Sequence, residues 1–404
     1  MLAQAGLRRL LASRLGAQWG DGLFQAGLAG AVLFNPERAA DPAGIAAGFT
    51  VLLLPYSLVG PFAGALLDRW DRRRVLTVAN LLRGVLILLT ALAVGRGLGG
   101  LPLYAGALVT VGISRFVNAG LSAALPHVVP ERNLVEANAV VTTLGAATAV
   151  VGAGYAVGLR ALFGVGNVGS AWVTAVSAVG SILGAWFVGR FAAGALGPDD
   201  VNEPVETVVA IARGLVDGGR AALRAPRVAA GFVALFAHRA AFAASLMITV
   251  LLLRYSFHDI GPLRAGMAGL GEVALAGGLG LLAAGLSTAR LVGWLGRGRA
   301  VCVALVLAAI TQVGLGLPML LPTILVAAFL LTAVGQVVKL CVDSAVQQDI
   351  PDDTRGRVFA LYDTLFNITQ VVAVALTAMV VPADGRAPGL VLAATVLYLV
   401  GMAG

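Results

Sequence analysis

The sequence has few charged residues and few cysteines for its length. Charged side chains make up 12% of its 404 residues, whereas hydrophobic ones make up 59%. A soluble domain has about a quarter of its residues charged, so this composition excludes a protein whose whole surface faces water. The two cysteines, Cys302 and Cys341, both lie in apolar runs without metal-ligand spacing. The sequence therefore predicts neither a disulfide framework nor a cysteine metal site.

The sequence also lacks the short motifs of catalysis and nucleotide binding. It contains no GxSxG, no Walker loop and no HExxH, and His127, His238 and His258 are not spaced as metal ligands. We therefore expect no enzyme activity, no cofactor and no metal. The net charge of +8 comes from basic residues scattered among short loops, which indicates membrane orientation and not a nucleic-acid partner.

The sequence does contain a series of long apolar runs separated by short polar loops. A helix needs roughly 20 apolar residues to cross the hydrocarbon core. Strands are excluded because the runs are long and have no polar alternation. We predict an all-α polytopic membrane protein with twelve transmembrane helices, at about 15–34, 43–67, 75–95, 101–124, 134–157, 165–190, 228–253, 263–287, 300–318, 322–346, 357–381 and 388–404.

Arginine positions predict the orientation of these helices. Loops with arginine clusters, such as 69–74 and 297–299, alternate with loops that hold few arginines. The side with more arginines is expected to be cytoplasmic, which places both termini in the cytosol of a bacterial cell, with the chain in the inner membrane.

One long connection divides the chain. It predicts an N-terminal six-helix bundle at 1–190, a cytoplasmic linker at 191–227 and a C-terminal six-helix bundle at 228–404. In the linker, Val208, Ala212 and Leu215 recur at helical spacing, which predicts an interfacial amphipathic helix. We interpret this helix as a tether between the bundles, with a regulatory or partner-docking role as the alternative.

A charge cluster between the second and third predicted spans recurs in the second half of the chain. The first copy is 64–74, and its echo begins at Gly285, which lies 221 residues after Gly64. A second pair of similar strings begins at Pro130 and Pro351, at the same offset. Two matches at one offset indicate a duplicated membrane unit, and hence two pseudo-symmetric bundles.

The first copy, Gly64-x-x-x-Asp68-Arg69-x-x-Arg72-Arg73-Arg74, resembles the signature loop of the major facilitator superfamily, with Asp71 in place of the usual glycine. Other strings are similar to the drug:proton antiporter-3 branch, which includes macrolide and siderophore exporters. The resemblance covers the whole chain and implies two six-helix bundles around a central cavity that opens alternately to each side. The strings are Gly20-Asp21, Leu125-Pro126-x-Val128-Val129-Pro130-Glu131-Arg132-x-Leu134-x-x-Ala137-Asn138-Ala139 and Pro351-x-x-x-Arg355-Gly356-Arg357-Val358.

The charge cluster suits a state-dependent latch on the cytoplasmic side. A glycine lets two helix backbones approach, and a carboxylate can cap a helix end or pair with an arginine while this side is closed. The alternative is a topology signal that only holds the loop inside. Ala289 stands in the echo where the first copy has an acid, so any latch is asymmetric. The predicted latch residues are Gly64, Asp68, Arg69, Arg72 and Arg73.

Polar side chains inside the predicted spans are candidates for proton and substrate handling. Each ionisable one costs at least about 2.5–3.5 kcal/mol in hydrocarbon, so it needs a partner, a water-filled cavity or a function. Asp21 could take up a proton, with a packing contact as the alternative. Arg115 is similar to an arginine of the family's fourth helix that is linked to proton transfer, or it is a structural counter-ion. Arg83 is expected to extend to the cytoplasmic face, and Tyr56 and Asn118 to line the cavity.

In the second half, Glu272 is the most isolated acid in any predicted span. It is our first candidate for a protonatable site, with an ion pair to Arg239 or another buried base as the alternative. His238 titrates near neutrality and could relay protons, or it could bond to a backbone carbonyl. Each of these three residues is a candidate for proton coupling or substrate contact.

The last spans carry one further polar group. Lys339 and Asp343 are four residues apart, so they can neutralise each other as a structural pair. Asp363, Asn367 and Gln370 follow at successive turns, and we expect this polar stripe to face the cavity. Asp363 is the candidate for proton coupling, and the two amides are candidates for the lining.

These observations predict a secondary transporter that exports a drug-like or amphipathic molecule by alternating access, coupled to proton entry. Its expected partners are protons, a small-molecule substrate and the lipid bilayer, with the chain acting as a monomer. A lipid or lysolipid translocator, or a siderophore exporter, is the alternative with the same fold. A non-transporting membrane receptor or assembly partner is the alternative of another class.

Overall fold

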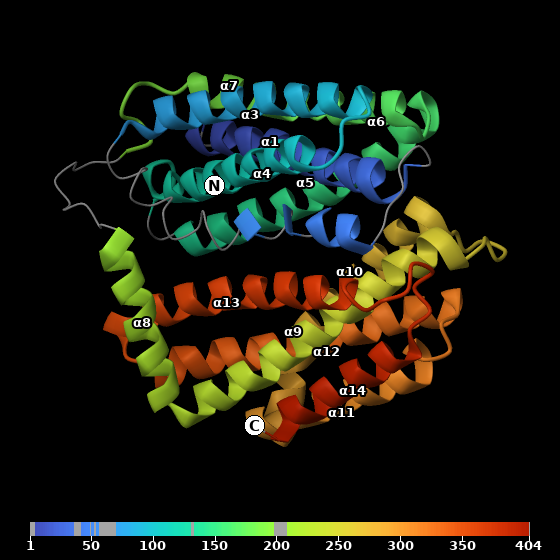
Figure 1. Ribbon diagram of the computed structural model, residues 1–404. Coiled ribbons are helices and arrows are strands. Elements are labelled where there is room, and N and C mark those ends of the chain that lie inside the picture. Colours follow the sequence, from blue (N-terminus) through green and yellow to red (C-terminus); the bar gives the residue numbers. More distant parts are fainter. Residues whose placement is uncertain are drawn as a thin grey trace. The chain divides into compact units, whose positions relative to one another are not determined.

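Helices form nearly all of the secondary structure. The computed structural model describes residues 5–35, 42–48, 50–51, 54–55, 70–130, 133–197 and 208–403 (Figure 1). Within these ranges the β-type pairing amounts to one isolated bridge, between Ile260 and Leu263. The prediction of an all-α fold is therefore confirmed.

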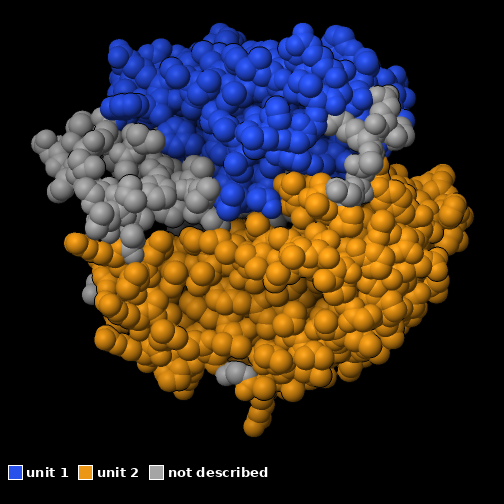
Figure 2. All heavy atoms as spheres, in the orientation of Figure 1, with its two compact units in different colours: residues 1–39, 50–207 blue, residues 40–49, 208–404 orange. Residues whose placement is uncertain are grey.

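The chain divides into two units, which Figure 2 shows in different colours. Unit 1 comprises Met1–Ala39 and Thr50–Thr207. Its helices are α1 (Ala5–Leu33), α3 (Arg72–Gly95), α4 (Leu101–Ala123), α5 (Leu134–Phe163), α6 (Asn167–Val176) and α7 (Ala178–Gly189), with a short 3-10 turn, η1, at Leu125–His127.

Unit 2 comprises Ala40–Phe49 and Val208–Gly404. Residues 42–48 of its first segment are helical. In its second segment the α-helices begin with α8, which occupies most of the second half of the long connection. Two short π-helical turns continue α9 and α11, at η3 (Leu252–Ser256) and η4 (Gln312–Gly316). The α-helices are α8 (Val208–Arg224), α9 (Pro226–Leu251), α10 (Gly266–Leu295), α11 (Arg297–Thr311), α12 (Leu321–Asp349), α13 (Asp352–Ala378) and α14 (Pro388–Ala403).

Nine helical segments of the described chain are long and apolar enough to cross a membrane. Three of the twelve predicted spans, the first, the second and the twelfth, are not among these nine segments. α1 occupies the first predicted span but contains several arginines and Asp21, and α14 is a shorter helix of 16 residues. The second predicted span, 43–67, lies mostly outside the described residues.

The sixth predicted span, 165–190, is divided into α6 and α7 at Ser177. The Ser177 hydroxyl donates a 2.6 Å hydrogen bond to the Thr174 carbonyl oxygen. Such a bond to a nearby backbone carbonyl competes with the helical ladder. The break also lies against α1, since a Cβ added to Gly20 would be 2.8 Å from the Ser177 carbonyl oxygen.

Glycines hold α1 in backbone contact with two neighbouring helices. α1 packs most extensively against α5 and α7. A Cβ added to Gly180 of α7 would lie 2.5 Å from the Gly16 carbonyl oxygen, and one added to Gly22 would overlap the Ala149 carbonyl of α5. Close approach through small residues is the usual way in which helices associate in lipid. The backbone on both sides of Asp21 is therefore fixed by two neighbours.

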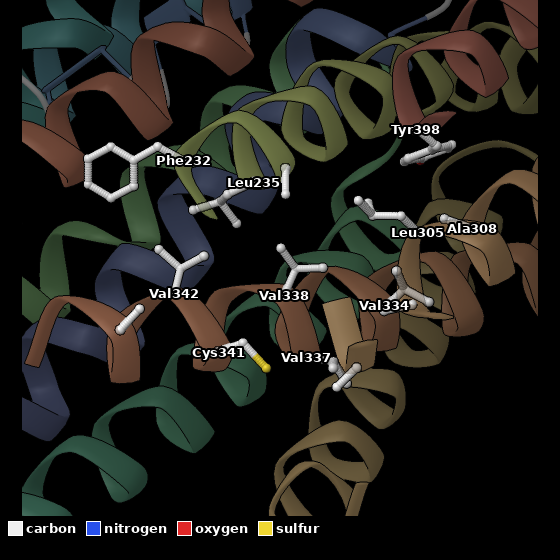
Figure 3. Close-up of a cluster of buried hydrophobic side chains, with 14 of the residues drawn as sticks. Phe232, Leu235, Leu305, Ala308, Val334, Val337, Val338, Cys341, Val342 and Tyr398 are labelled. Carbon is white, nitrogen blue, oxygen red and sulfur yellow. The ribbon is translucent and has the colours of Figure 1, made fainter. Parts of the chain in front are cut away.

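The core of unit 2 is built mainly from aliphatic residues of α9, α11, α12 and α14. Leu235 of α9, Leu305 of α11, Val338 of α12 and Tyr398 of α14 are each at most 1% exposed. Figure 3 shows these side chains converging from the four helices, with Cys341 one turn along α12. The four helices therefore pack as one bundle around a common core.

Candidate functional site

A buried ion pair lies at the centre of unit 1. Arg83 Nη1 of α3 is 3.0 Å from Asp21 Oδ1 of α1, and the two side chains are 1% and 7% exposed. A charge taken out of water is stable only when it is paired and hydrogen-bonded. The pair therefore brings together the predicted proton-coupling residue Asp21 and a cation that satisfies it.

Hydrogen bonds extend this pair into a network that joins four helices. Arg83 Nε donates to Ser181 Oγ of α7 at 2.9 Å, and its Nη1 lies 3.5 Å from Ser114 Oγ of α4. Asn118 Nδ2 of α4 donates to Asp21 Oδ2 at 3.2 Å, so both carboxylate oxygens are bonded. Charge-assisted bonds of this kind are the stronger ones in proteins.

The expectation that Arg83 extends to the cytoplasmic face is wrong. Arg83 lies eleven residues after the start of α3, or about 16 Å along the axis at about 1.5 Å per residue. That distance is too long for its side chain to reach the end of the helix. The sequence did contain a signal for this pair: a buried Asp21 requires a cation at its own depth in the membrane.

The network continues along α1 as a polar seam with α4. Gln18 Nε2 donates to Asn118 Oδ1 at 3.0 Å, and one turn earlier Arg14 Nη1 donates to Ser122 Oγ at 2.9 Å. The seam therefore links Asp21 to polar groups nearer the start of α1. The predicted lining residue Asn118 belongs to it.

The predicted proton-transfer residue Arg115 lies half-buried on α4, one residue from Ser114 of the network. The arginine that contacts Asp21 is Arg83. The proton-transfer role that the resemblance implies for Arg115 stays a prediction, and the pair with Arg83 adds a cation from α3 beside Asp21.

Two of the predicted latch residues act inside unit 1. Arg72 Nη1 donates to the Ala123 carbonyl oxygen at 3.0 Å, and Arg73 Nη2 donates to the Gly189 carbonyl oxygen at 2.9 Å. These carbonyls belong to the last turns of α4 and α7, where a cation satisfies free carbonyl groups and the helix dipole. The side chains therefore fasten α3 to two helix ends. The other latch residues, Gly64, Asp68 and Arg69, and the predicted lining residue Tyr56, lie outside the described residues.

Asp71, which stands where the family's signature loop usually has a glycine, has a structural role in this chain. Its Oδ1 accepts a 3.0 Å hydrogen bond from the Arg73 backbone N–H, so Asp71 is the N-cap of α3. Aspartate is among the preferred residues at this position, since its carboxylate satisfies an unpaired N–H of the first turn. A glycine there could not make this bond.

In unit 2, His238 is buried where α9 crosses α12. Its Nε2 lies 3.1 Å from the Leu331 carbonyl oxygen, and its ring stacks on Phe242 at a centroid distance of 6.1 Å. A Cβ added to Gly335 would overlap the imidazole. The arrangement matches the structural alternative, in which histidine bonds to a backbone carbonyl.

Arg239, the next residue, lies 3.9 Å over the ring of Phe366 of α13. This cation–π contact stabilises a guanidinium that forms no ion pair with any described residue. The ion pair with Glu272 that we considered as an alternative is therefore not formed in the described chain. Arg239 is half-buried.

The polar groups of α12 and α13 form a second charged cluster. Lys339 Nζ is 2.7 Å from Asp343 Oδ2, which gives the expected i,i+4 pair. Asp363 is exposed and lies within electrostatic reach of both charges of that pair. Asn367 donates to the Asp363 backbone carbonyl at 2.8 Å, and Gln370 is buried at 4% exposure. The predicted stripe therefore begins exposed and ends buried.

Glu272 lies near the start of α10 and is half-buried. Its Oε1 accepts from the Arg264 backbone N–H at 3.1 Å, in the loop that precedes the helix. In the same loop Asp259 accepts from the Ala265 N–H at 2.8 Å and pairs with the Arg264 side chain at 3.0 Å. These donors lower the pKa of the Asp259 carboxyl below its usual value. Two carboxylates, those of Asp259 and Glu272, therefore hold the backbone of the loop that precedes α10.

Among the described residues, no group of three or more His, Cys, Asp or Glu side chains could hold a metal ion.

The sequence model of the protein family named Major Facilitator Superfamily matches residues 15–374 of the chain. The chain belongs to the major facilitator superfamily. Its members are membrane transporters, so this chain is a multi-pass membrane transporter and not an enzyme.

A relative and two solved structures agree with membership of the superfamily. An MFS-type transporter of Mycobacterium tuberculosis is 45% identical over 400 residues, which cover 98% of this chain and 89% of the relative. A nucleoside transporter structure aligns with a TM-score of 0.72 at 12% identity and covers 98% of this chain and 97% of its own. A POT peptide transporter structure aligns with a TM-score of 0.71 at 16% identity, covering 99% and 94%. At these identities the two structures show the fold alone.

Proposed function

We propose that this major facilitator superfamily transporter couples proton entry to the export of a drug-like or amphipathic small molecule across the inner membrane. The observation that carries the proposal is the buried pair of Asp21 and Arg83. The strings similar to the drug:proton antiporter-3 branch support the direction and the class of substrate. Both termini are then cytoplasmic, as the arginine distribution indicates.

The pair can couple proton binding to a change of helix packing. While Asp21 is ionised it neutralises Arg83, and α1, α3, α4 and α7 are held by one network. Protonation of Asp21 removes that attraction and leaves Arg83 as a buried charge without a counter-ion. Loss of one partner of a buried pair costs about 3–5 kcal/mol. Moving a two-state equilibrium from 1:99 to 99:1 needs about 5.5 kcal/mol, so this cost supplies between about half and most of the free energy of such a switch.

The remaining site residues have supporting roles in this proposal. Asp363, beside the Lys339–Asp343 pair, is the candidate for a second protonation step. Arg115 and Arg239 are proposed to contact the substrate or shape its path, and His238 to hold α9 against α12 through its contact with the Leu331 carbonyl. Glu272 is proposed as a weaker candidate for protonation, because its carboxylate already accepts a bond from the α10 entry loop. The latch proposal rests on Gly64, Asp68 and Arg69 together with the anchored Arg72 and Arg73.

The test uses a variant that removes the titratable pair without leaving a buried charge. Inside-out membrane vesicles containing the wild type or the double variant Asp21→Asn with Arg83→Gln are given an inward-acid pH gradient and a mixed library of amphipathic compounds. Mass spectrometry then identifies what accumulates. We expect compounds that accumulate in wild-type vesicles only while the gradient lasts, and no accumulation above empty vesicles with the double variant.

The matched control is Asp217→Asn with Arg220→Gln, which removes an exposed pair on α8 and is expected to transport like the wild type. Accumulation that survives collapse of the gradient would contradict proton coupling and favour facilitated or lipid movement. Unchanged gradient-driven accumulation by the Asp21 and Arg83 double variant would show that the coupling residues are elsewhere. No accumulation of any compound would favour a receptor.

A further inference from the structure

A cavity of about 530 Å³ opens at one end of unit 2. It lies among the first turns of α9 and α11 and the last turns of α12 and α14, and all four ends are in the described chain. Small side chains leave this space empty: Ala230 and Ala234 of α9, and Ala345 of α12, line its wall. A Cβ added to Gly298 of α11 would meet nothing within 4 Å. The volume is in the range of ligand pockets, about 300–1,000 Å³.

The same cavity carries two arginines on its wall. Arg227 follows the first residue of α9, and Arg297 is the first residue of α11. Arg297 Nη1 is 3.4 Å from Ser344 Oγ, and Arg227 Nη1 is 4.0 Å from Asp349 Oδ1 with its side chain 78% exposed. These contacts are long, and a guanidinium has several N–H donors in a planar fork, so both arginines keep donors for another acceptor. The cavity therefore combines a largely apolar wall with two basic side chains.

We propose that this cavity binds one anionic phospholipid of the surrounding leaflet, with its phosphate on Arg227 and Arg297 and an acyl chain along Ala230, Ala234 and Val301. Arginine recognises phosphate through paired N–H donors. In the orientation proposed above, these helix ends lie on the cytoplasmic side. The cytoplasmic leaflet is rich in anionic headgroups, and basic pockets between helices at that face bind them. The bound lipid joins the ends of α9, α11, α12 and α14. This site is independent of the proposed proton coupling, which lies in unit 1.

The cysteines of the chain provide a direct reporter of the cavity. Cys302 of α11 and Cys341 of α12 are the two cysteines in the sequence, and both line it. Cys302 is exposed, whereas Cys341 is buried; Figure 3 shows Cys341 on the face of α12 that carries the core. A lipid chain in the cavity would cover the Cys302 thiol. Its reaction with a small uncharged reagent therefore measures occupancy without any cysteine replacement.

The experiment places the full-length protein in nanodiscs of phosphatidylcholine, with or without phosphatidylglycerol. N-ethylmaleimide is added, and mass spectrometry of the Cys302 peptide gives the labelling rate. With phosphatidylglycerol present we expect the rate to fall by at least about fivefold, since protection follows the fraction of protein with lipid bound. The double variant Arg227→Gln with Arg297→Gln is expected to label at the same rate in both membranes, and the Lys version of the double variant to retain part of the protection.

Arg299→Gln is the matched control. Arg299 lies on the first turn of α11, two residues from Arg297, but it is exposed and does not line the cavity. We expect this variant to be protected like the wild type. Equal labelling of the wild type in both membranes, or protection that the Arg227 and Arg297 double variant retains, would overturn the proposal.

Discussion

The Arg83→Gln variant is expected to lose about 3–5 kcal/mol of its free energy of unfolding, because Asp21 is then a buried carboxylate without a counter-ion. The double variant Asp21→Asn with Arg83→Gln is expected to recover most of that loss, since two neutral amides have no charge to bury. The measurement is denaturation of the purified protein in mixed micelles, followed through a complete double-mutant cycle.

The control for this cycle is the exposed pair of Arg220 and Asp217, which are 3.3 Å apart on α8. Its removal is expected to change stability by less than about 1 kcal/mol, because solvent screens exposed pairs. An Arg83→Gln loss no larger than that of Arg220→Gln would show that Arg83 is not held as a buried cation. A double variant as unstable as the single one would show that the charges do not interact.

The Gly152→Ala variant is expected to disrupt the contact between α5 and α1. A Cβ at Gly152 would overlap the Trp19 carbonyl, and neither backbone can move without shifting the other helix. Overpacking of a core usually costs about 1–3 kcal/mol, and here the obstacle is backbone, so we expect at least the upper end of that range. The yield of folded protein and its thermal unfolding temperature are the readouts.

Gly154→Ala on the same helix is the matched control. A Cβ at Gly154 would meet nothing within 4 Å, so the change has no steric cost. Replacing a mid-helix glycine with alanine stabilises by about 0.5–1 kcal/mol in general. Equal behaviour of the two variants would contradict the backbone contact between α1 and α5. Because Gly20 and Gly22 flank Asp21, loss of this contact is also expected to weaken the Asp21–Arg83 pair.

The sequence was sufficient for the fold class and for one member of the central pair. Length and apolarity of the runs gave the helices, because nothing but a helix satisfies its own backbone in lipid. Asp21 stood out because an acid is costly at that depth. Arg83 did not stand out, because a long basic side chain near a basic loop can be explained by its extending to the membrane face. Whether Arg83 pairs with Asp21 or extends to the membrane face depends on the direction that α3 takes through unit 1. That direction is set by helix packing.

Other differences have the same origin in tertiary contacts. Glu272 is isolated in the sequence, yet its carboxylate is used by the loop before α10, which folds back onto the helix. The break at Ser177 reflects a side-chain bond and the close approach of α1, neither of which hydropathy records. Asp71 departed from the family pattern, but its role as the α3 N-cap follows from local rules and could have been predicted.

The central claim is that Asp21 takes up a proton and thereby releases Arg83. Infrared difference spectroscopy of the full-length protein in membranes tests it directly, because a protonated carboxyl has a C=O stretching band that a carboxylate lacks. On acidification the wild type is expected to gain a band that is absent from the Asp21→Asn and Arg83→Gln double variant and retained in Asp363→Asn. A carboxyl band unchanged in the double variant would show that Asp21 does not titrate and would contradict the account.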